Sequence, residues 1–79
     1  MTNELRDRAI NLAASYFANW KACEAALEHD DARDYRNRYE GAMQMAALLG
    51  IEEAEIEAYA LDKWGDLIGR LYDDNHATW

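Results

Sequence analysis

The stretch AMQMAALLGIEE, residues 42–53, marks the end of one helix and the start of the next. Gly50 follows a run of good helix formers, and glycine is the residue that most often adopts the left-handed conformation just past a helix end. The apolar Ile51 behind it can fold back onto the last helical turn, and Glu52 and Glu53 then fall where carboxylates favour the positive end of a new helix dipole. The stretch therefore predicts a tight turn between two helices.

The rest of the chain extends this helical pattern in both directions. There is no proline, glycine occurs four times, and alanine, leucine and glutamate are abundant. We predict helices at about residues 4–29, 32–49 and 52–72, with Asp30 and Asp31 capping the second helix and a tail over 73–79. The fold class is therefore all-α: one domain over residues 1–79, built as a compact three-helix bundle with short turns.

Apolar residues recur every three or four positions in each segment and define the expected buried faces. The first stripe comprises Leu5, Ala9, Leu12, Tyr16, Trp20, Cys23 and Leu27, widened by Ile10, Ala13 and Phe17. The second comprises Tyr35, Tyr39, Ala42, Ala46 and Leu49, with Met43 beside them. The third comprises Ala54, Ala58, Leu61, Trp64, Ile68 and Leu71, flanked by Leu67 and Tyr72. Gly65 and Gly69 interrupt the third stripe and predict a kink or a tight helix crossing.

The small size of the chain limits the core that it can build. A lone Cys23 cannot form an intrachain disulfide and indicates a reducing compartment, so we expect a cytoplasmic protein. No apolar run approaches the ~20 residues of a membrane span. Wide apolar stripes and Trp79, which no helical stripe can bury, predict a homodimer.

Negative charge is concentrated in the second half of the chain. The formal net charge is -8, and residues 40–79 hold nine acidic residues against only Lys63 and Arg70. Such a surface repels phosphate backbones and attracts basic proteins. We therefore expect no direct nucleic-acid binding and a protein partner with a basic surface, such as a nucleic-acid-binding complex.

The acidic residues of the third helix form the principal candidate site, which we call the acidic ridge. Its members are Glu52, Glu53, Glu55, Glu57, Asp62, Asp66, Asp73 and Asp74. A charged face is usually only a solvated one, but lysines normally alternate with acids on such a face, and here they do not. Asp73 and Asp74 also lie at the unfavourable end of the helix dipole. These features favour a docking surface for lysine and arginine.

A secondary candidate combines arginines and aromatic residues and would suit a phosphate or nucleotide contact. It comprises Arg33, Arg36, Arg38, Tyr35, Tyr39 and Trp79. The competing interpretation is that Asp34 and Glu40 neutralise these arginines across one helical turn.

A metal site is the third alternative. Asp30, Asp31 and Asp34 spell the aspartate-rich pattern that holds magnesium in prenyl-diphosphate enzymes, but a helix start explains the same letters. His29 and His76 have no converging carboxylate or nucleophile, and Cys23 falls in an apolar stripe. We therefore expect no enzyme activity, no metal and no cofactor.

The segment from Arg38 to Ile51 resembles one found in short helical proteins of bacteriophages and mobile elements of Gram-positive bacteria. Small size, acidity and helical content together are similar to those of the anti-CRISPR and related counter-defence inhibitors. This resemblance implies a phage inhibitor that docks an acidic surface on a basic, nucleic-acid-handling host protein. The alternative function is a structural or accessory module that assembles with itself or with a partner chain.

Overall fold

The computed structural model describes residues 3–76, and these residues form three α-helices, which confirms the all-α three-helix architecture. The helices are α1 (Asn3–Ala25), α2 (His29–Leu48) and α3 (Glu53–His76). Thr2, which could cap the first helix, and Trp79 lie outside the described residues.

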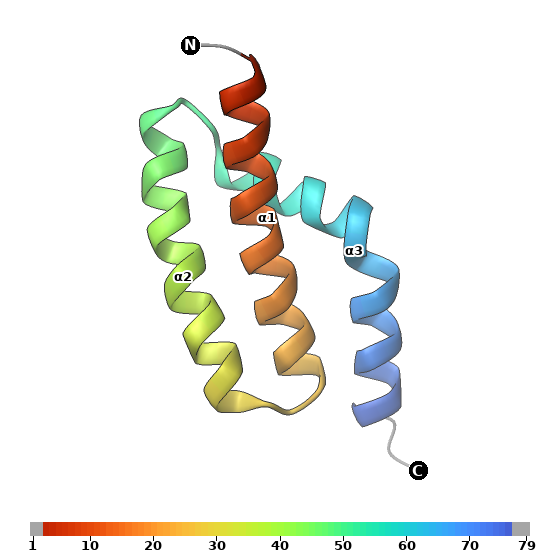
Figure 1. Ribbon diagram of the computed structural model, residues 1–79. Coiled ribbons are helices and arrows are strands. Elements are labelled where there is room, and N and C mark those ends of the chain that lie inside the picture. Colours follow the sequence, from red (N-terminus) through yellow and green to blue (C-terminus); the bar gives the residue numbers. More distant parts are fainter. Residues whose placement is uncertain (1–2, 77–79) are drawn as a thin grey trace.

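The middle position in the fold belongs to α1. It packs extensively against both other helices, whereas α2 and α3 contact each other only weakly (Figure 1). The first turns of α3 cross α1, and the helix then bends so that its second half runs alongside α1. The three helices therefore do not enclose a common centre, and part of α1 is exposed between the two flanking helices.

The turn at Gly50 has the predicted form. Gly50 has a φ of 76°, its N–H donates to the Ala47 carbonyl at 3.0 Å, and the Ile51 N–H donates to the Ala46 carbonyl at 3.1 Å. This pair of hydrogen bonds is a Schellman motif. Ile51 is 3% exposed, so its side chain does pack back into the core as expected.

The first helix ends four residues earlier than predicted, because Leu27 forms the same motif without a glycine. Leu27 has a φ of 63°, and the N–H groups of Leu27 and Glu28 donate to the carbonyls of Glu24 and Cys23 at 3.1 and 2.8 Å. The second helix consequently starts at His29, and Asp30 and Asp31 lie within its first turn instead of capping it. In the first turn, their carboxylates interact favourably with the positive end of the helix dipole.

These two turns allow a matched test of left-handed backbone strain. Gly50→Ala should lower the free energy of unfolding by about 1–2 kcal/mol, the cost of this conformation for an L-residue. No atom lies within 4 Å of the added Cβ, so sterics contribute nothing. Leu27→Gly should raise it, because the relieved strain exceeds the ~0.5–1 kcal/mol of extra chain entropy that glycine adds to the unfolded state. Urea denaturation midpoints moving in the same direction for both variants would contradict this.

The buried face of α1 differs from the predicted stripe. Its centre is Ile10, Ala13, Ala14 and Phe17, each no more than 7% exposed, whereas Leu5, Leu12 and Leu27 are about half exposed. The predicted stripe was therefore displaced toward one edge of the true one. A helix packed between two neighbours buries the sector that faces both of them, and the small side chains of Ala13 and Ala14 allow both to approach closely.

The buried face of α3 also differs. Ile56 and Ala60 are fully buried and Trp64 packs against the same core, whereas Ala54, Ala58 and Leu61 are exposed. Because apolar residues occupy more than one face of this helix, periodicity identified the partly buried Trp64, Ile68 and Leu71 but missed Ile56 and Ala60. Gly65 and Gly69 do not serve a tight crossing, since a Cβ at Gly65 would meet only Leu61 at 3.9 Å and one at Gly69 would meet nothing. The bend of α3 leaves the predicted kink as the better explanation.

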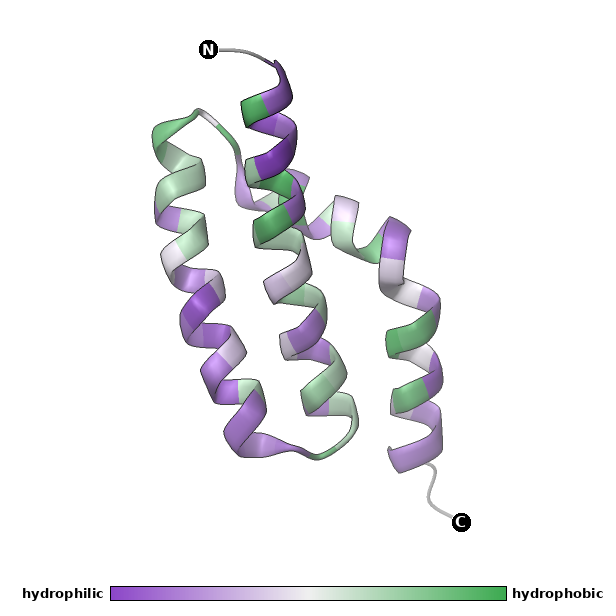
Figure 2. Ribbon diagram, in the orientation of Figure 1, coloured by the Kyte–Doolittle hydropathy of each residue, from purple (hydrophilic) through white to green (hydrophobic). Residues whose placement is uncertain are grey.

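The core side of α2 matches its prediction, with Tyr39 and Ala46 buried and Tyr35, Ala42, Met43 and Leu49 partly buried. The helix is hydrophilic at its start and hydrophobic toward its end (Figure 2). The third helix continues past the predicted end at residue 72, so Asp73 and Asp74 are helical, and the Asn75 side chain donates to the Leu71 carbonyl at 3.0 Å.

Candidate functional site

The acidic ridge does not form one continuous surface. Asp62, Asp66 and Asp73 are spaced by four and seven residues, so they share one side of α3, and all three are exposed. We call these three residues the outer acidic line. Glu52, just before α3, and Asp74, in its last turn, are also exposed.

Glu55 has a structural role that the sequence did not reveal. The Arg6 guanidinium donates to both of its carboxylate oxygens at 2.7 Å and thereby links the start of α1 to the start of α3. The hydrogen bond to Glu55 raises the pKa of Arg6 above its ordinary value. This contact makes Glu55 the only ridge member with an ion pair within residues 3–76.

Glu53 and Glu57 lie on a different side of α3 from the outer acidic line. They are one helical turn apart and line a groove of about 630 Å³ together with residues of α1 and α2. The α2 residues that line the groove are Arg36, Tyr39, Glu40, Met43 and Gln44. We call Glu53 and Glu57 the groove pair.

The floor of the groove is aromatic. The ring centroids of Phe17 and Tyr39 are 5.3 Å apart, those of Phe17 and Trp20 are 5.8 Å apart, and those of Trp20 and Tyr39 are 5.8 Å apart. Lys21 Nζ lies 4.0 Å from the centroid of the Trp20 ring, within cation–π distance. The sequence pattern placed Phe17 and Trp20 only in the apolar stripe of the first helix, and Tyr39 both in the stripe of the second helix and in the arginine and tyrosine patch. The one signal that could have identified the groove is the unusual width of the first apolar stripe.

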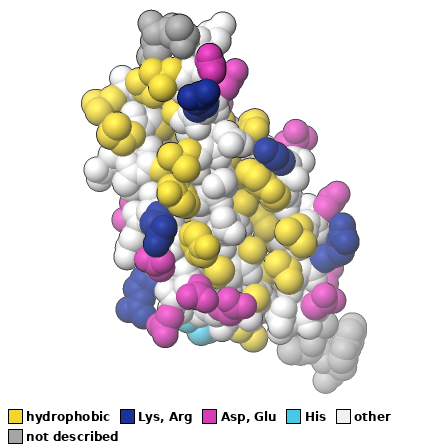
Figure 3. Space-filling view, viewed as in Figure 1, with side chains coloured by type: hydrophobic (Ala, Val, Ile, Leu, Met, Phe, Trp, Pro, Cys, Tyr) yellow, Lys and Arg dark blue, Asp and Glu magenta, His cyan; other side chains and the backbone are white. Residues whose placement is uncertain are grey.

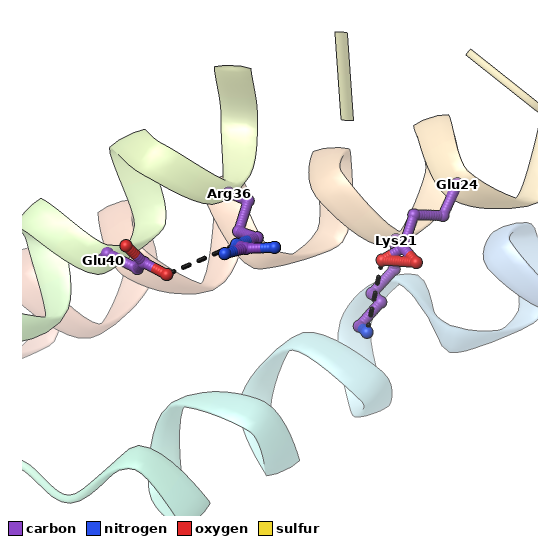
Figure 4. A network of polar contacts seen from close by, with 4 residues as sticks. All are labelled: Lys21, Glu24, Arg36 and Glu40. Atoms are coloured by element: carbon purple, nitrogen blue, oxygen red, sulfur yellow. Dashed lines mark hydrogen bonds and ion pairs between the residues drawn. The ribbon is translucent and has the colours of Figure 1, made fainter. Parts of the chain in front are cut away.

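The two cations at the groove are already paired within their own helices. Figure 4 shows Arg36 of α2 beside Glu40, at 3.4 Å, and Lys21 of α1 beside Glu24, at 3.5 Å. Glu53 and Glu57 make no ion pair among the described residues. The negative charge left uncompensated in the groove is therefore that of the groove pair.

A second hollow of about 370 Å³ lies between α1 and the second half of α3. Leu61, Ile68 and Tyr72 line it from α3, and Glu24 and Ala25 from α1. Both hollows are lined by Phe17 and Lys21, so they adjoin at this part of α1.

The Tyr39 hydroxyl is buried at the groove and makes no hydrogen bond with the described residues. Burial raises the pKa of Tyr39 to about 12, and the nearby negative charges of Glu53 and Glu57 add to the shift. The raised pKa means that the folded chain favours the protonated phenol of Tyr39. The contribution of this group to the free energy of unfolding is complete below the usual tyrosine pKa of about 10 and is lost as the pH rises toward 12.

We expect the double substitution Glu53→Gln/Glu57→Gln to lower the pKa of Tyr39, because removing two negative charges makes the phenolate less unfavourable. NMR titration of the labelled tyrosine ring can resolve Tyr39 from the other four tyrosines. Asp62→Asn/Asp66→Asn removes the same charge on the opposite side of α3 and serves as the control. A pKa that falls equally in both variants would show that Tyr39 responds to net charge and not to the groove pair.

The arginine and tyrosine patch is largely self-neutralised. Asp30 lies 2.8 Å from Arg33, Glu40 lies 3.4 Å from Arg36 and Asp34 lies 3.3 Å from Arg38. Tyr39 is 4% exposed, so its ring cannot stack on a base, and Tyr35 is partly buried. Of this patch, the structure brings only Arg36 and Tyr39 to the groove.

The other candidates remain dispersed. Two of the three aspartates in the Asp30, Asp31 and Asp34 cluster pair with arginines, and no group of three potential metal ligands converges within the described part of the chain. Burial, followed by the charges of Glu28 and Asp31, raises the pKa of the Cys23 thiol, which disfavours the reactive thiolate. His29 is exposed.

None of the helices over residues 3–76 is both long and apolar enough to cross a bilayer.

Comparison with protein-family models, with curated proteins and with solved structures finds no match for this chain.

Proposed function

We propose that this chain is a small protein-binding module that docks the acidic surface of α3 on a basic surface of another protein. The observation that carries the proposal is the lack of charge compensation along this helix. Within residues 3–76, the Arg6–Glu55 contact is the only ion pair that any acid of α3 makes. A helix with acids selected for solubility alone normally carries lysines at four-residue spacing.

The basic residues of α3 do not offset its acids. Lys63 donates to the Asn11 side chain of α1 at 3.3 Å and lies 4.7 Å from the centroid of the Trp64 ring. Arg70 makes no ion pair in the described part of the chain. The potential over α3 therefore suits lysine and arginine side chains of a partner, and it disfavours nucleic acid.

A narrower form of this proposal is an inhibitor that covers the nucleic-acid-binding surface of a host protein, as the anti-CRISPR-like profile of the sequence implies. A basic surface that binds phosphate backbones also binds a row of carboxylates, so such a protein would compete directly with nucleic acid.

We expect Asp62→Lys/Asp66→Lys to reduce the amount of partner captured from a bacterial lysate by about tenfold, which corresponds to ~1.4 kcal/mol. Both carboxylates are exposed and unpaired, so the fold should survive. Glu4→Lys/Asp7→Lys makes the same charge change on α1 and should have little effect. Retained helicity in far-UV circular dichroism is checked first, and equal capture by both variants at physiological salt would overturn the proposal.

Homo-oligomerisation is the second candidate function, and exposed apolar side chains favour it. Leu48 and Met45 of α2 are 80% and 66% exposed, and apolar side chains spread over the face shown in Figure 3. Added salt discriminates between the two candidates, since electrostatic docking weakens steeply with ionic strength and apolar self-association does not.

A further inference from the structure

We propose that the groove between α1, α2 and the start of α3 binds one amphipathic helix of the partner protein, with an apolar side chain on the aromatic floor and a lysine or arginine on the groove pair. This inference rests on the proposed function and specifies where and how the partner is recognised.

The arrangement of the helices provides the space for another helix. Because α2 and α3 flank α1 and contact each other only weakly, the α1 stretch from Phe17 to Glu24 borders hollows between them, with Phe17 buried and the Lys21 and Glu24 side chains 38% and 46% exposed. This stretch is two helical turns long, or ~10 Å at a rise of about 1.5 Å per residue. Two hollows of about 630 and 370 Å³ meet along it. A partner helix lying there would take the fourth position of a helical bundle.

The floor of the groove suits an apolar anchor. Trp20 and Met43 are the partly exposed apolar side chains of this floor, and the buried rings of Phe17 and Tyr39 support Trp20 from beneath. The unbranched side chain of Met43 adapts to different shapes. Helix recognition in grooves commonly uses apolar anchors spaced three and four residues apart. Leu61, Ile68 and Tyr72 in the adjoining hollow extend the apolar surface to a second such anchor.

Charge complementarity identifies the occupant as basic. Lys21 and Arg36 already have carboxylate partners in Glu24 and Glu40, so an incoming acid would meet no free cation at this groove. Glu53 and Glu57 have no ion pair within residues 3–76, and Glu57 is partly buried. A lysine or arginine of the partner can pair with both carboxylates through charge-assisted hydrogen bonds.

A second copy of the chain does not meet the same requirements. Each copy carries a net charge of -8, and Arg33, Arg36 and Arg38 of α2 are paired with acids of their own helix. Self-docking through α2 would therefore bring like charges together or break these pairs. Arg70 of α3 has no ion pair within residues 3–76, but Asp66, Asp73 and Asp74 lie one helical turn from it, so docking through Arg70 would also bring acids to the groove pair. A basic helix from a different protein avoids both costs.

The test is an NMR titration of the ¹⁵N-labelled chain with a synthetic amphipathic helical peptide that has leucines at alternating three- and four-residue spacing and lysines on its other face. We expect chemical shift changes at the amides of Phe17, Lys21, Met43 and Glu57. Glu53→Gln/Glu57→Gln should weaken peptide binding by about tenfold, in line with ~1.4 kcal/mol or more for lost charge-assisted hydrogen bonds. The matched control, Asp62→Asn/Asp66→Asn, should weaken it less than about twofold, because these exposed charges lie outside the groove and one short peptide helix does not reach them, whereas the whole partner protein would.

The outcomes separate this inference from the proposed function. Shifts confined to the outer acidic line, with loss of binding only in Asp62→Asn/Asp66→Asn, would overturn the groove site and leave acidic docking by α3 intact. Absence of binding at low salt would overturn both. Concentration-dependent shifts at the groove without peptide, together with a dimer in sedimentation equilibrium, would assign the groove to a second copy and overturn the inference. Neither Glu53→Gln/Glu57→Gln nor Asp62→Asn/Asp66→Asn removes an ion pair of the described residues, so both variants should fold.

Discussion

Ile56→Ala is expected to lower the free energy of unfolding by about 2–5 kcal/mol, the usual cost of truncating a buried aliphatic side chain to alanine. Ile56 is the largest side chain that is fully buried among the described residues, at 0% exposure, and it lies where α3 packs on the core. A small domain is stable by only about 5–15 kcal/mol in total. Urea denaturation followed by far-UV circular dichroism should show a much lower midpoint or an unfolded chain.

Leu61→Ala, on the same helix, is the matched control. Leu61 is 56% exposed, so truncation removes little buried area and should cost less than about 1 kcal/mol. The contrast matters because the sequence placed Leu61 in the buried stripe of the third helix. Equal losses of stability in the two variants would mean that the buried face of α3 described above is wrong.

Phe17→Ala is expected to cost about 3–5 kcal/mol, the range for deleting a buried phenylalanine. Phe17 is 6% exposed, contacts the rings of Trp20 and Tyr39, and lines both hollows. Phe17→Leu, which keeps most of the apolar volume, should cost less, and the difference between the two variants measures what volume alone supplies. Thermal unfolding of both variants gives this comparison directly.

Phe17→Leu also links stability to recognition. Under the groove inference this variant folds but offers a smaller, non-aromatic floor to the partner. If Phe17→Ala unfolded with an unchanged midpoint, Phe17 would not belong to the core, and the aromatic floor of the groove would lose its structural basis.

The sequence by itself determined the helical class, the number of helices and the turn at Gly50. These features depend on signals that act over a few residues: the absence of proline, helix-forming composition, and a glycine followed by an apolar residue. It also supplied the acidic residues of the third helix and the acid and base pairs along α2, because side chains one turn apart on a helix are neighbours in any tertiary context.

Tertiary structure decided which sector of each helix is buried. It therefore also decided which acids of α3 line the groove and which lie outside it. Periodicity gives an apolar stripe but not the directions of the neighbouring helices, so Leu12 and Leu61 were misplaced and Ile56 was overlooked. The position of α1 between two helices that barely touch opened the groove and separated Glu53 and Glu57 from the outer acidic line. The left-handed Leu27 was equally unpredictable, because no glycine marks this turn and the packing of α1 on α2 that the turn permits is a tertiary contact.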